Sequence, residues 1–69
     1  REGDKIDAVP TSKSKADILE EAGVLLKQAS GNLLSASVWS ANGHADQEKH
    51  HTEYANQLIR SASSKLATL

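Results

Sequence analysis

The chain has 69 residues, a net charge of −1 at pH 7 and no cysteine, which excludes disulfides and thiolate metal sites. A chain of this length forms at most one domain, and its near-neutral charge argues against a nucleic-acid backbone as the partner. Because Trp39 and Tyr54 are the only aromatic residues and Met is absent, any core must be built from Leu, Ile, Val and Ala.

Residues 1–13 are predicted to form an extended or flexible N-terminal arm. Gly3 and Pro10 interrupt any helical pattern, and Val9 is biased towards extended geometry because it precedes a proline. The alternative is that Ile6 and Val9 dock the arm on a neighbouring molecule. Because the sequence contains no methionine, we expect a processed form or a piece of a longer chain, and the localisation stays unknown.

The first helix is predicted over about residues 14–41. Ser14 and Asp17 have the spacing of a capping box, in which a side chain at the helix start accepts a backbone N–H. The pair Gly31 and Asn32 is a stop signal, and a break at Gly31 is the alternative. We favour one continuous helix, because the apolar phase carries on through this pair unchanged.

One stripe of this helix has a heptad pattern, with Leu at one core position and Ala at the other. Its members are Leu19, Ala22, Leu26, Ala29, Leu33 and Ala36, spaced alternately three and four apart. At about 100° per residue they share one side of the helix, so the pattern predicts a close contact with a second helix.

Asn42 and Gly43 are predicted to form the turn, because Gly tolerates positive φ and Asn suits the ends of helices. The second helix is expected over about residues 44–67. It continues the packing seam through Ala55, Leu58, Ala62 and Leu66. A short link makes the helices antiparallel neighbours. The expected pairs are Leu33 with His51, Leu26 with Ile59, Ala22 with Ala62 and Leu19 with Leu66.

The sequence therefore predicts an all-α antiparallel helical hairpin over residues 14–69, completed to a helical bundle by a second copy or a partner. Two helices bury only one stripe each, so other apolar side chains are left to meet that partner. The expected interface residues are Leu25, Leu34, Val38 and Trp39.

The sharpest chemical constellation is His44, Glu48 and His51, whose spacings of four and three place them on one inward face near the turn. A Glu-x-x-His pair is the spacing of di-metal helical bundles, and these side chains suit Zn²⁺, Fe or Mn²⁺. The interpretation we favour is a polar end to the seam, where the bundle opens to water.

We expect a non-enzymatic protein–protein interaction or oligomerisation module, or a small accessory subunit of a larger complex, with no cofactor. No spacing supports a catalytic triad, and no glycine-rich phosphate loop occurs. The alternatives are a bundle that binds a divalent metal such as Zn or Fe, and a peripheral membrane hairpin. Nucleic acid is disfavoured as a partner because the basic residues form no single stripe. A membrane surface is disfavoured because Lys and Arg are not enriched on the polar face of the helices.

Overall fold

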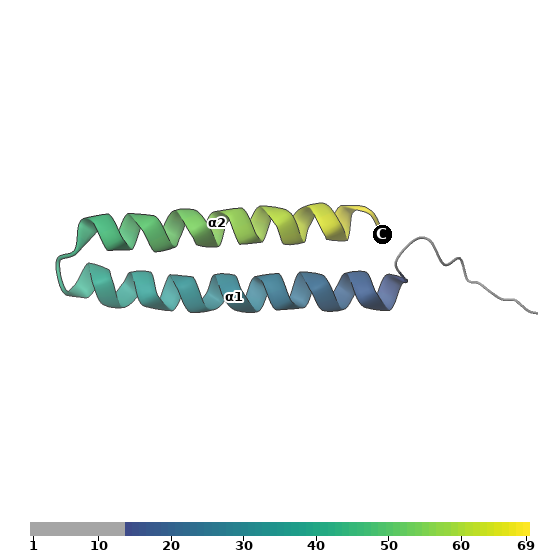
Figure 1. Ribbon diagram of the computed structural model, residues 1–69, viewed down its shortest axis with the longest axis horizontal. Helices are drawn as coiled ribbons and strands as arrows, with labels where there is room; N and C mark the ends of the chain where they lie inside the picture. The colour runs from purple at the N-terminus through teal and green to yellow at the C-terminus, as the bar shows by residue number, and fades with distance from the viewer. Residues whose placement is uncertain (1–13) are drawn as a thin grey trace, which may run out of the picture.

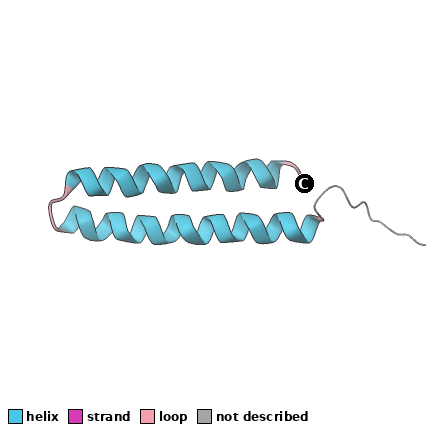
Figure 2. Cartoon of the chain, viewed as in Figure 1, coloured by secondary structure: helices cyan, strands magenta, loops and turns pink. Residues whose placement is uncertain are grey.

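The computed structural model describes residues 14–69, so the arm expected at 1–13 lies outside the described residues. Two helices make up nearly all of the described part: α1 (Lys15–Ala41) and α2 (Ala45–Ala67). They lie side by side and antiparallel, joined by a short turn (Figures 1 and 2). The prediction of an all-α two-helix hairpin is confirmed.

The start of α1 is capped by Ser14. The Oγ of Ser14 accepts a hydrogen bond from the backbone N–H of Asp17 at 3.2 Å, which satisfies one of the N–H groups that a helix start leaves free. From there α1 runs through Gly31 as one continuous helix. A glycine inside a helix costs on the order of 1 kcal/mol relative to alanine, and the packing of α1 on α2 offsets this cost.

The turn between the helices rests on local hydrogen bonds and one glycine. The Asn42 side chain donates from Nδ2 to the Val38 carbonyl oxygen at 2.9 Å. Gly43 has a φ of 78°, a left-handed conformation that favours glycine. The His44 N–H then donates to the Trp39 carbonyl oxygen at 2.9 Å. The chain thus reverses within a few residues, which makes the two helices antiparallel.

The contact between the helices is narrow and built mainly from alanine. The buried residues are Ala22, Ala29, Ala36, Ala55, Leu58 and Ala62. The alanines of α1 recur every seven residues, so the same side of the helix meets α2 along its length and the backbones can approach closely. Leu58 is the largest of these side chains, and the hairpin therefore buries little apolar surface by itself.

The predicted seam and the observed contact share the alanines and differ beside them. Leu19, Leu26 and Leu33 are 48%, 42% and 45% exposed, so they flank the contact instead of filling it. Leu66 is 40% exposed and also lies at the edge.

The residues of α1 that are more buried at the contact stand one position before the predicted leucines: Leu25 before Leu26, and Asn32 before Leu33. Leu25 packs against the buried cluster of Ala29, Ala55 and Leu58. Leu25 and Leu26 lie about 50° on either side of the alanine line, so helical phase alone does not separate them. Leu58 occupies the same side of the contact as Leu25. Ile59 packs against the same cluster from the other side, and Leu26 beside it remains 42% exposed.

Candidate functional site

The residues at the edge of the contact form an apolar strip that we call the leucine face. It consists of the exposed Leu19, Leu26 and Leu33 of α1 and Leu66 of α2, together with the half-buried Ile59 of α2. Leu26, Leu33 and Ile59 line an open groove of about 290 Å³, whose other lining residues are Ala29, Ser30 and Leu34. Both helices therefore contribute to the groove at the centre of this face.

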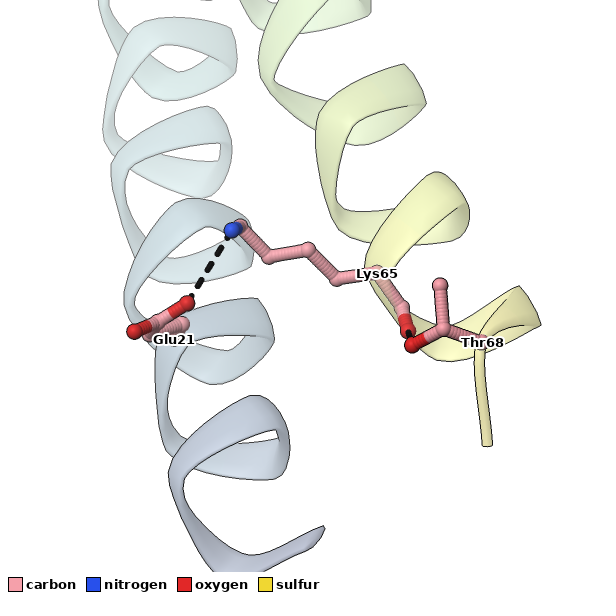
Figure 3. A network of polar contacts seen from close by, with 3 residues as sticks. All are labelled: Glu21, Lys65 and Thr68. Atoms are coloured by element: carbon pink, nitrogen blue, oxygen red, sulfur yellow. Dashed lines mark hydrogen bonds and ion pairs between the residues drawn. The ribbon is translucent and has the colours of Figure 1, made fainter. Parts of the chain in front are cut away.

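A different surface, which we call the ion-pair face, lies by helical position on the other side of the buried alanines Ala22, Ala29 and Ala36. Its centre is an ion pair of 3.0 Å between Lys65 Nζ of α2 and Glu21 Oε1 of α1 (Figure 3). Thr68 anchors the end of α2 beside it, with Oγ1 donating to the Lys65 carbonyl oxygen at 2.6 Å. The groove here is about 500 Å³ and is lined by Glu20, Glu21, Val24, Leu25, Gln28 and Lys65. Four of the six residues that line this groove are charged or polar, against one of six in the groove of the leucine face, so the two faces of the hairpin differ in chemistry.

The four residues expected at an interface have different environments. Leu34 is 68% exposed and Val38 is 59% exposed, so both are open to a partner. Leu25 is less open: it is half-buried, packs against the buried cluster and lines the groove of the ion-pair face. Trp39 is half-buried, and its ring meets the His44 ring edge-on, with centroids 5.2 Å apart.

The three expected metal ligands lie near the turn, in separate environments. His44 is exposed at the start of α2 and contacts Trp39 through its ring. Glu48 is half-buried one turn later, where its carbonyl oxygen accepts a hydrogen bond from Thr52 Oγ1 at 2.8 Å. Over residues 14–69, no group of three or more His, Cys, Asp or Glu side chains is arranged to hold a metal ion.

His51 takes part in a polar contact between the helices. Its Nδ1 lies 2.9 Å from Oδ1 of Asn32, and both residues are half-buried. The Asn32 amide nitrogen donates to the Gln28 carbonyl oxygen at 2.9 Å, which orients the amide oxygen towards His51. Because an amide oxygen only accepts, Nδ1 of His51 carries the proton and donates. The neutral ring is therefore the Nδ1–H tautomer, with Nε2 as its acceptor.

Sequence reasoning missed Asn32, which was interpreted only as part of a helix stop signal. The signal that identifies it is its spacing. Asn32 stands seven residues after Leu25 and seven before Trp39, on the inner line that the structure uses. A polar residue at a core position of a heptad indicates a partner on the facing helix.

Comparisons of the chain with protein-family models, curated proteins and solved structures find no match. Neither helix of the described part has the length and apolarity that crossing a membrane requires.

Proposed function

We propose that this protein is a non-enzymatic helix–helix association module. Its hairpin is completed to a helical bundle by a second copy or by helices of a partner protein, either in an oligomer or as an accessory subunit of a larger complex. The observation that supports this function is the leucine face, where three leucines at seven-residue spacing remain 42–48% exposed and two of them, Leu26 and Leu33, line a groove.

The thin core of the hairpin supports the same proposal. Five of the six buried residues are alanines, which bury little apolar area each. Chains of this size are marginal on burial alone and are commonly completed by oligomerisation or another staple. Covering the leucine face adds large apolar side chains to the core, and this burial is the driving force for association.

A photo-crosslinking residue placed at position 33 tests the proposal in the native source of the protein. Leu33 lies within the proposed contact, where it lines the groove of the leucine face. Glu53 is exposed on α2, pointing away from α1 by helical position, and serves as the matched control. We expect adducts from position 33 and none from position 53. Adducts from both positions, or from neither, would contradict the proposal.

A second measurement asks whether the adduct depends on the leucine face. With the crosslinker at position 33, Leu26→Gln is expected to lower the adduct yield, because it removes an apolar side chain one heptad away on the same line. Val24→Gln is the matched change on the ion-pair face, where Val24 is 50% exposed. We expect it to leave the yield unchanged. Equal losses in both variants would show that the contact does not use the leucine face.

A further inference from the structure

We infer that the leucine face is covered by a second copy of this chain, so that two hairpins form a four-helix bundle through a two-fold contact of like faces. This inference rests on the proposed function and names its partner. It follows from the charge, the size and the spacing of the face.

Along the line of its leucines the leucine face carries no charge, and by helical position Lys27 and Arg60 stand only at its outer edges. Between the leucines and isoleucine of the face, helical position places only small or polar neutral side chains: Ser30, Ser37, Thr52, Asn56 and Ser63. In a two-fold contact each patch meets its own copy, so a patch of one sign would repel itself. A neutral patch has no such penalty. The ion-pair face, with Glu20, Glu21 and Lys65, is less suited to this pairing.

The size of the face fits a stable dimer. The 23 residues of α2 give a length of about 35 Å at the usual helical rise, and two helices side by side give a width of about 20 Å. The resulting area of roughly 700 Å² per hairpin approaches the roughly 800 Å² per partner of standard stable interfaces. A second hairpin has the same length and can cover the face from end to end.

The spacing of the leucines is itself symmetric. Leu19 and Leu33 lie seven residues before and after Leu26, so a two-fold axis near Leu26 matches each leucine level with another leucine level. The small side chain of Ser30 lies between Leu26 and Leu33 at the groove and leaves room for an incoming leucine. Leucines that enter such gaps are the usual packing of helical bundles.

Sedimentation equilibrium of the complete 69-residue chain tests this inference over a wide range of concentration. The expected mass is twice the 7.4 kDa of the chain, with dissociation on dilution. Thermal unfolding followed by circular dichroism should shift to higher temperature as concentration rises, because association stabilises the folded state by mass action. This second readout needs no variant and stays informative if a variant fails to fold.

Variants on the two sides of α1 locate the contact. Leu26→Gln with Leu33→Gln should weaken dimerisation by about 100-fold or more, since four leucines per dimer lose their burial. Val24→Gln makes the same kind of change at an exposed position off the leucine face. We expect the dimer affinity of this control to change by less than about threefold.

The outcomes separate this inference from the proposed function. A helical chain that remains a monomer at every concentration, or that forms a trimer or larger oligomer, overturns the second-copy inference. If that monomer still gives crosslinks from position 33 to a different protein, the association function stands and only its partner was wrong. If position 33 gives no adduct, both fail. A dimer that the Leu26 and Leu33 changes leave intact also overturns the inference.

Discussion

The Nδ1 of His51 on α2 donates to the Oδ1 of Asn32 on α1 across 2.9 Å, in a contact otherwise made mainly of alanine and leucine. Alanine recurs every seven residues along α1, so a shift of one heptad would set alanine on alanine again. The same shift would separate Asn32 from His51. Together with the short turn, this pair therefore specifies one register of the two helices, as polar residues at core positions do in coiled coils.

Replacing Asn32 by Ala should destabilise the hairpin by about 1 kcal/mol, because the half-buried Nδ1 of His51 loses its acceptor. Urea unfolding followed by circular dichroism measures the change. Asn56→Ala is the matched control, since Asn56 is exposed on α2. That control should be neutral or slightly stabilising through helix propensity. Equal effects of the two substitutions would show that the Asn32–His51 contact contributes nothing.

Replacing both Asn32 and His51 by Leu has a different expected outcome. Two apolar residues of suitable size remove the polar pair without leaving an unpaired group, so stability should be kept or raised. The loss should appear in specificity, as a mixture of oligomeric states in sedimentation. A double variant that is much less stable than the parent would show that the pair contributes net stability and not mainly register.

The hairpin could be predicted from the sequence because its determinants are local. Alanine spacing, the Ser14 cap and the Asn42–Gly43 turn each act within a few residues. The inner line of α1 could not be predicted in the same way. Leu25 and Leu26 flank the alanines at equal angles, and the choice between them depends on how the second helix packs against α1.

Gly31→Ala should stabilise the protein by about 0.5–1 kcal/mol. Gly31 lies inside α1, and a Cβ built on it meets nothing within 4 Å, so alanine adds helix propensity without a clash. Gly43→Ala is the contrasting change: its surroundings are equally open, but its φ of +78° is strained for alanine. We expect Gly43→Ala to destabilise by about 1 kcal/mol. Thermal unfolding of both variants decides, and a destabilising Gly31→Ala would contradict the continuous, open helix described for this position.

Ala55→Leu should destabilise the hairpin by about 1–3 kcal/mol, because Ala55 is fully buried and a larger side chain forces the helices apart. Ala67→Leu makes the same change at an exposed position at the end of α2 and should have little effect. Urea unfolding compares the two variants at one protein concentration. If Ala55→Leu leaves stability unchanged, close approach of the helices at the alanines is not required.

The ion pair between Glu21 and Lys65 should contribute little to stability, although it is the most conspicuous polar contact of the hairpin. Its side chains are 34% and 38% exposed, so water and salt screen the attraction. A double-mutant cycle with Glu21→Gln and Lys65→Gln isolates the pair from the other contacts of each residue. We expect a coupling of about 0.2–1 kcal/mol that shrinks as salt is added. A coupling of several kcal/mol that resists salt would mean that the helices are held together mainly on the ion-pair face. In that case the leucine face would be a smaller part of what keeps the two helices paired.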